Sequence, residues 1–271
     1  MSLQLLRGTA QLWRTSAIWW PLGWGIYVLT IGATVVSISK TVDLEQYLRA
    51  LPAGFGAAFG IGTVGPGGEH FSGALYLLGA ELFGSALIVA AIFAMFVAPG
   101  LVAREADRGT LDTLLARPLS RRSYIATRFA FFALVTAAFG LATLAGSAIA
   151  FGPIGGYAIP WRGLGAVSGL LALGALAFGG VGFLVAALRL STGAGTAAIA
   201  ITLAVMFVLN LAASAEPLLA TPAKLSFFSY WQPVATLFTE RLDWGAVFAY
   251  GAVAMVTAVA SVEVFARRDI A

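Results

Sequence analysis

Residues Arg104–Arg122 read READRGTLDTLLARPLSRR, a charged segment of 19 residues that separates two long apolar runs. The whole chain has 271 residues, of which 60% are hydrophobic and only 10% are charged, far outside the composition of a water-soluble domain. About 20 consecutive apolar residues are enough for a helix to cross a bilayer. The sequence therefore predicts an all-α, multispanning membrane protein in which residues 104–122 are the main charged connection between spans.

Six apolar stretches have the length of a membrane-spanning helix and together form one transmembrane domain, residues 1–271. Such a chain has no room for a separate soluble catalytic domain. The predicted spans are residues 17–39, 82–103, 124–151, 164–188, 192–213 and 244–265.

Flanking segments are predicted to lie at the membrane surface. Residues 3–13 have the apolar periodicity of a helix in the membrane plane. A short external helix is expected at residues 43–51, and the conformation of the Gly-rich loop 53–72 is left open. Tryptophans near the first span and aromatic residues of the loop before the last span are expected at headgroup depth. These are Trp13, Trp19, Trp20 and Trp24, and Phe227, Phe228, Tyr230 and Trp231.

Basic residues predict the orientation of the chain. Six spans place both termini on one side, and eleven of the 16 basic residues fall on that side, so it is expected to face the cytoplasm across the plasma membrane. This topology explains the net charge of +4 without a nucleic-acid partner. The terminal side carries Arg7, Arg14, Arg104, Arg108, Arg117, Arg121, Arg122, Arg128, Arg189, Arg267 and Arg268, and the opposite side Lys40, Arg49, Arg162, Lys224 and Arg241.

The residue types exclude most enzyme chemistry. The chain has no cysteine and a single histidine, His70, so thiolate chemistry, paired-histidine metal sites and Ser/His arrangements cannot be built. Ser39–Thr41 lacks the glycines of a phosphate-binding loop. We therefore expect no catalytic residue, metal or cofactor in this chain, and any ATP must be hydrolysed on a partner.

The charged segment has the features of a docking element. Gly109 ends the preceding helix and Thr110 can cap a new one, which Pro118 then stops. An apolar stripe on this short helix would enter a groove on a partner protein; it consists of Leu111, Leu114 and Leu115.

Two acidic residues of this segment leave two interpretations open. Glu105 and Asp107 either contact the partner or form local pairs with a nearby arginine. The candidate arginines for such pairs are Arg104, Arg108 and Arg121.

This pattern resembles the type 2 permeases of ATP-binding-cassette exporters, in which an acidic residue, Gly-Thr-Leu, Leu-Leu and Pro-x-Ser-Arg follow one another between the second and third spans. Here the pattern is Glu105 to Arg121. Similarity extends to residues 225–230 and 265–270, although Phe227 stands where relatives often have proline.

The resemblance implies two membrane subunits, identical or paired with a second permease, and two ATPase subunits that bind Mg-ATP and push on a coupling helix. ATPase contacts are then expected at Arg104, Glu105, Asp107, Gly109, Thr110, Leu111, Leu114, Leu115, Arg117 and Pro118.

The function that this resemblance implies is export of a hydrophobic or amphipathic compound (drug-like, lipid-like or peptide) from the cytoplasm, as in multidrug efflux. Glu81 and Asn210 are candidate pathway residues, although an interfacial or interhelical role is an alternative for each. Gly165 and Gly169 are expected to pack against a neighbouring helix of the same chain. An ion- or proton-coupled secondary transporter and a non-transporting membrane scaffold remain the competing hypotheses.

Overall fold

The computed structural model describes residues 3–39, 75–110 and 120–267, and this part of the chain is helical without a strand. Six helical segments are long and apolar enough to cross a membrane, which confirms the predicted all-α architecture. Their main helices are α1 (Leu3–Ser39), α5 (Ala86–Asp107), α7 (Arg121–Ile149), α8 (Trp161–Arg189), α9 (Thr192–Ala215) and α12 (Trp244–Arg267).

Shorter elements extend or connect these helices. The π-helices η1 (Leu78–Phe83) and η2 (Ala150–Ile154) continue the second and third spans toward the same end of the bundle. The fifth and sixth spans are joined by η3 (Pro217–Leu219), α10 (Ala220–Ala223), η4 (Phe227–Tyr230) and α11 (Pro233–Thr239). The predicted short helix 43–51 and loop 53–72 lie outside the described residues.

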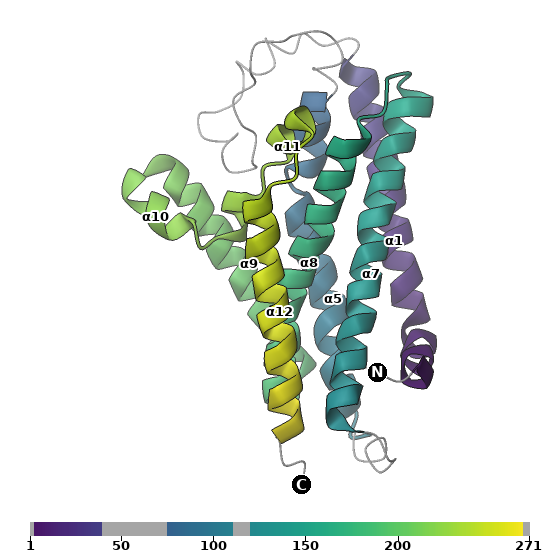
Figure 1. The fold of residues 1–271 in the computed structure, drawn as a ribbon, viewed down its shortest axis with the longest axis vertical. Coiled ribbons are helices and arrows are strands. Elements are labelled where there is room, and N and C mark those ends of the chain that lie inside the picture. Colours follow the sequence, from purple (N-terminus) through teal and green to yellow (C-terminus); the bar gives the residue numbers. More distant parts are fainter. Residues whose placement is uncertain (1–2, 40–74, 111–119, 268–271) are drawn as a thin grey trace.

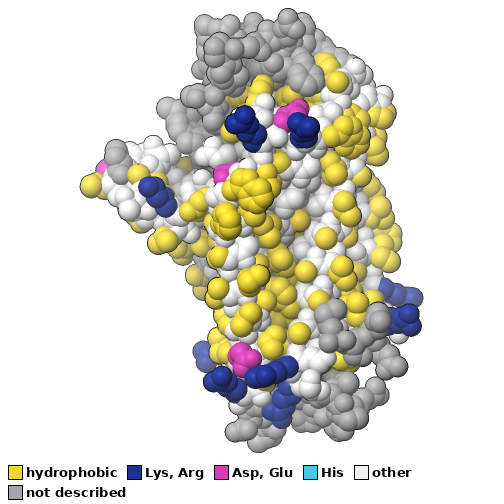
Figure 2. All heavy atoms as spheres, in the orientation of Figure 1, with side chains coloured by type: hydrophobic (Ala, Val, Ile, Leu, Met, Phe, Trp, Pro, Cys, Tyr) yellow, Lys and Arg dark blue, Asp and Glu magenta, His cyan; other side chains and the backbone are white. Residues whose placement is uncertain are grey.

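Helix α8 lies at the centre of the bundle, where it contacts α5, α7, α9 and α12. The start of α1, the end of α5, the start of α7 and the end of α12 share one end of the molecule (Figure 1). On the face shown in Figure 2, Lys and Arg side chains gather near the two ends, and hydrophobic side chains are spread over the surface between them. This belt is the surface that a bilayer requires, and an even number of spans places the first and last helix ends on one side.

Helix α1 differs from the prediction of a surface helix followed by a separate span. It runs without interruption from Leu3 to Ser39, with Pro21 inside it. The apolar face of its first part packs on the protein core instead of on lipid: Trp13 is buried and Leu6 contacts the core. The indole of Trp24 is also buried and donates a 2.8 Å hydrogen bond to Thr143 Oγ1. An indole that finds an internal acceptor has no need of the headgroup region.

The aromatic residues before the last span are also placed differently from the prediction. Phe227, Phe228 and Trp231 are buried within the protein, so their side chains do not face lipid headgroups. Trp231, 1% exposed, donates from Nε1 to the carbonyl of Phe83 in η1, and the hydroxyl of Tyr250 donates to the carbonyl of Phe227. These bonds tie the connection between the fifth and sixth spans to η1 and α12.

Glycines bring α8 close to its neighbours, but not the two that were predicted. Gly165 and Gly169 have no described atom within 4 Å of an added Cβ, so their expected packing is wrong for this chain. The contacts come from other glycines: Gly179 meets the ring of Phe132, and Gly182 meets Ile199 of α9. At the start of α8, Gly163 meets the backbone of Leu237 in α11, so close approach occurs at both ends of the helix.

Gly195 tests this contact between α8 and α9. A Cβ at Gly195 would lie 2.6 Å from the carbonyl oxygen of Gly182 and 2.7 Å from Cβ of Pro99, and backbone atoms cannot move away cheaply. We expect Gly195→Ala to lower the free energy of unfolding by about 1–3 kcal/mol, as overpacking does. The measurement is thermal unfolding of the detergent-solubilised protein.

Gly193→Ala is the matched control for that change. Gly193 lies on the same helical turn, is exposed and has only an ordinary 3.8 Å neighbour. Alanine there should stabilise the helix by up to about 1 kcal/mol through its helix propensity. Equal effects of the two substitutions would contradict the proposed close contact.

Candidate functional site

Helix α5 ends as the sequence predicts. Gly109 adopts a left-handed conformation (φ +67°), and its N–H donates to the carbonyl of Ala106. The N–H of Thr110 reaches back to the carbonyl of Glu105, completing the pair of bonds that closes a Schellman C-cap. The hydroxyl of Thr110 donates to the same carbonyl at 3.2 Å. The charged segment therefore leaves α5 through a fixed turn.

Helix α7 begins with an N-cap at the other end of the charged segment. The hydroxyl of Ser120 accepts a 3.1 Å hydrogen bond from the N–H of Ser123. Residues 111–119 lie outside the described residues, including the predicted contact residues Leu111, Leu114, Leu115, Arg117 and Pro118. The structure thus describes the two helix ends between which the charged segment lies.

The last turn of α5 connects to three other spans. The guanidinium of Arg104 lies 5.1 Å from the ring centre of Trp13 in α1, a cation–π contact. A carboxylate oxygen of Glu105 lies 2.6 Å from Arg128 of α7.

The third connection is made by Asp107, whose Oδ2 accepts a 3.1 Å hydrogen bond from the backbone N–H of Thr192. Thr192 is the first residue of α9, so the carboxylate also faces the positive end of that helix. One turn of α5 therefore contacts α1, α7 and α9. We call residues 104–107 and their three contacts the α5 foot.

The Glu105–Arg128 pair is the buried part of the α5 foot. The side chain of Arg128 is 4% exposed and that of Glu105 is 13% exposed. The guanidinium of Arg128 also lies over the ring of Tyr124, 5.0 Å from its centre. Removing one partner of such a pair leaves a buried charge without compensation, which typically costs 3–5 kcal/mol.

Three polar atoms of this cluster have no hydrogen-bond partner within the part of the chain that the structure describes. They are Oε2 of Glu105, one terminal nitrogen of Arg128 and the hydroxyl of Tyr124, all buried. The cluster thus keeps unused hydrogen-bonding capacity beside the point where the charged segment begins.

Sequence reasoning placed Arg128 among the basic residues of the cytoplasmic surface and missed its role. Glu105 does form an ion pair within the chain, but its partner lies 23 positions away on the next span and is none of the three arginines considered for it. An available signal was position: Arg128 follows Arg121 by two turns inside an apolar stretch, where an arginine requires a partner.

A second, exposed set of charges joins α7 to α12 at the same end. Glu263 accepts from Arg122 of α7 at 3.0 Å and lies 3.7 Å from Arg267, one turn further along α12. Nearby, Tyr124 packs against Phe265 with ring centres 5.9 Å apart. The ends of α7 and α12 are therefore held together as well.

The candidate pathway residues lie on separate elements away from the α5 foot. Glu81 belongs to η1 and its side chain is exposed; the helical segment that contains it begins at Leu75, before the predicted start of the span at residue 82. Asn210 lies on α9 and is half-buried. Both have interactions within the chain, and their part in a pathway remains a prediction. Within the ranges that the structure describes, no group of three acidic or histidine side chains could hold a metal ion.

The sequence profile of the ABC-2 family transporter proteins matches residues 16–270. The chain belongs to this family. The match includes all six predicted spans and the charged segment, so the α5 foot is a feature of an ABC-2 membrane component. A comparison with curated proteins finds no match.

A double-mutant cycle tests the ion pair of this ABC-2 protein. Glu105→Gln and Arg128→Met should each lower the free energy of unfolding by roughly 3 kcal/mol, because each leaves one buried charge unpaired. The double variant should be more stable than the sum of the two losses predicts, since no unpaired charge remains. Thermal unfolding in detergent provides the measurement.

Glu263→Gln serves as the control, because that pair is exposed and should contribute less than about 1 kcal/mol. Additive losses in the double variant would show that Glu105 and Arg128 do not interact.

Proposed function

We propose that this chain is the membrane subunit of an exporter in which a separate ATPase, loaded with Mg-ATP, drives movement of a hydrophobic or amphipathic compound out of the cytoplasm. Family membership supports a transport role. The sequence contains no phosphate-binding loop, so the ATP must be bound by a partner. The observation that carries the mechanism is the α5 foot, which links the charged segment to three spans.

The coupling step follows from this geometry. The ATPase binds the leucine stripe of residues 111–115 and moves it when two ATPase subunits close on Mg-ATP. Because Arg104, Glu105 and Asp107 contact α1, α7 and α9, displacement of the segment shifts several spans together. A two-state bundle biased by a ligand in this way is the usual basis of switching.

Glu105 and Asp107 remain proposed ATPase contacts, as do Arg104, Gly109 and Thr110. Each of the two carboxylates already has a partner within this chain. An ATPase side chain that approaches them would therefore meet groups that also hold the spans together.

A second membrane subunit, identical or related, is proposed to cover α9. Of its 24 residues only Gly195 and Ile199 are buried, both near its start, and the helix leans away from the bundle toward α10 (Figure 1). Its exposed face includes Ile201, Val205 and Val208. A pathway between two such subunits would be lined by apolar side chains, with Glu81 and Asn210 as its proposed polar residues. Such a lining suits a drug-like, lipid-like or peptide cargo.

Substitutions in the leucine stripe test the partner. Leu111→Asp and Leu114→Asp place a charge where an apolar groove of the ATPase is proposed to close, so each should abolish co-purification of the ATPase and ATP-dependent transport. Leu218→Asp, at a residue that is 84% exposed in η3, provides the control and should leave both unchanged. Retained ATPase binding by both stripe variants would rule out the proposed docking helix.

Asp107→Ala separates binding from transmission. It removes the carboxylate that caps α9, together with one proposed ATPase contact, but it leaves the leucine stripe intact. The ATPase should therefore still co-purify when it is supplied in excess, while the movement of α9 is reduced. The chain has no cysteine, so Gly193→Cys and Val259→Cys can carry two spin labels, on α9 and α12. Mg-ATP should change the distance between these labels in the parent protein, and by less than half as much with Asp107→Ala. An unchanged response would exclude transmission through Asp107.

A further inference from the structure

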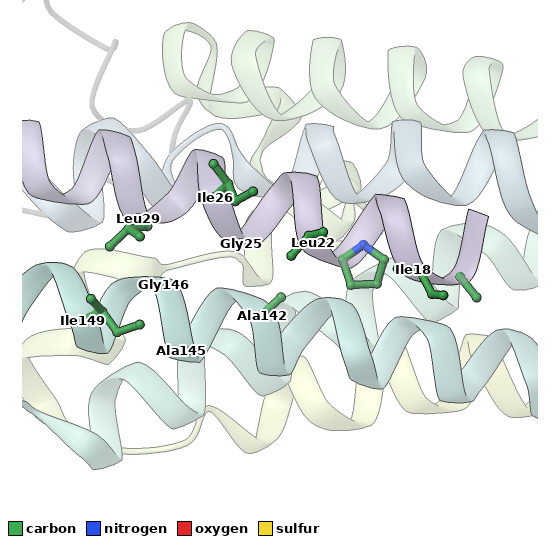
Figure 3. A pocket seen from close by; sticks show the side chains of 11 residues that line it. Ile18, Leu22, Gly25, Ile26, Leu29, Ala142, Ala145, Gly146 and Ile149 are labelled. Carbon is green, nitrogen blue, oxygen red and sulfur yellow. The ribbon is translucent and has the colours of Figure 1, made fainter. Parts of the chain in front are cut away.

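A groove of about 450 Å³ lies between α1 and α7 on the outside of the bundle. Leu22 of α1 lies across it from Ala142 of α7, and Leu29 of α1 lies across it from Ile149 of α7 (Figure 3). Every residue that lines it is Ala, Gly, Ile, Leu or Pro, so it offers no hydrogen bond from a side chain. An occupant of this groove must therefore be apolar along its length.

Small residues form the groove because the two backbones touch at its base. A Cβ at Gly146 would lie 2.6 Å from the carbonyl oxygen of Gly25. Larger side chains rise beside this contact, and Ile18 and Ile26 of α1 remain 57% and 55% exposed. The result is a narrow cleft above two touching helices.

The length of the groove corresponds to one leaflet. It extends along α1 from Ala17 to Leu29, and twelve steps of 1.5 Å give about 18 Å. The hydrocarbon core of a bilayer is about 30 Å thick, so one leaflet accounts for about half of it. A membrane-spanning helix would need the full thickness, whereas one acyl chain fits this length.

Charge at one end of the groove indicates the headgroup. On a helix with 100° between residues, Arg7 and Arg14 fall on the same face as Ile18, Leu22 and Gly25. Both arginines are exposed, and neither forms an ion pair with a described residue. This face of α1 therefore changes from basic to apolar within one turn, at the end of the groove nearest the start of the chain.

We propose that the groove between α1 and α7 binds one acyl chain of an anionic phospholipid from the leaflet on the side of the chain termini, with the lipid phosphate at Arg7 and Arg14. An arginine near an anionic membrane surface favours such a lipid, and the two together favour it over a zwitterionic one. The site does not depend on the exporter mechanism proposed above.

Native mass spectrometry of the detergent-solubilised protein, titrated with phosphatidylglycerol or with phosphatidylcholine of the same acyl chains, tests the proposal. The parent protein should retain one phosphatidylglycerol per chain with roughly tenfold higher affinity than phosphatidylcholine. Arg7→Gln with Arg14→Gln should reduce this preference to nearly none. Arg108→Gln with Arg189→Gln, two exposed arginines at the ends of α5 and α8, should leave it unchanged.

Ala145→Phe tests the groove itself. Ala145 lines the groove and is exposed, so phenylalanine there should occupy the space of the acyl chain. The affinity for both lipids should then fall at least fivefold. Ala137→Phe, two turns earlier on α7 and outside the groove, should have no effect. The unfolding temperature of each variant shows whether the bundle is intact, and the arginine variants test the site independently if Ala145→Phe does not fold.

Three outcomes would overturn the proposal. Equal retention of both lipids by the parent protein would remove the role of the arginines. Loss of a second copy of the chain from the Ala145→Phe particle, without loss of lipid, would show that the groove holds a neighbouring subunit. Equal competition by soluble glycerol 3-phosphate would reduce the site to a phosphate contact without an acyl chain.

Discussion

The ion pair between Glu105 and Arg128 is the buried charge pair that holds α5 to α7 at this end of the molecule. Arg128 enters α7 two turns after its start, where its charge is removed from water, and the carboxylate of Glu105 is the acidic group that reaches it among the described residues. Separating α5 from α7 would expose both charges to an apolar environment at a cost of several kcal/mol. The charged segment is therefore flanked by the end of α5 and the start of α7, and the ion pair requires these two helix ends to move together. A force applied to this segment reaches the bundle as a displacement of paired helices, not as bending of one loop.

Helix α9 is packed tightly near the α5 foot and loosely along the rest of its length. Its first turns are held by Asp107 and by the contact of Gly195 with Gly182, whereas no residue beyond Ile199 is buried. A helix fixed at one end and free along the rest can change its tilt without breaking many contacts in its own subunit. The connection after α9 is anchored again, because Ser226 donates to the carbonyl of Met206 and Trp231 donates to η1. Movement of α9 would thus be passed to the opposite end of the bundle through defined hydrogen bonds.

Hydropathy and end signals were sufficient to predict the six spans and the turn at Gly109, because each depends on neighbours in the sequence. Features that depend on which face of a helix turns inward could not be obtained in this way. Trp24 and Trp231 are of a residue type that favours membrane interfaces, but each is buried by a hydrogen bond to an acceptor 119 or 148 positions away in the sequence. Gly165 and Gly179 both lie in the same apolar helix, and only the folded structure shows that Gly179 meets Phe132 and Ala98 whereas Gly165 has no described neighbour. The α5 foot was half predicted: its acidic residues were identified, whereas their partners on α7 and α9 required the fold.

Helix α1 connects the two ideas developed from the structure. One of its faces packs on the protein through Trp13, which lies against Gly100 and under the guanidinium of Arg104. The adjoining face carries Arg7 and Arg14 and then the apolar groove against α7. A helix rotates about its axis as one rigid element. A lipid bound on the outer face of α1 would therefore also restrain Trp13 on the inner face. Arg104 belongs to the same turn of α5 as Glu105 and Asp107. The contact between Trp13 and Arg104 therefore connects the lipid-facing helix α1 directly to the α5 foot.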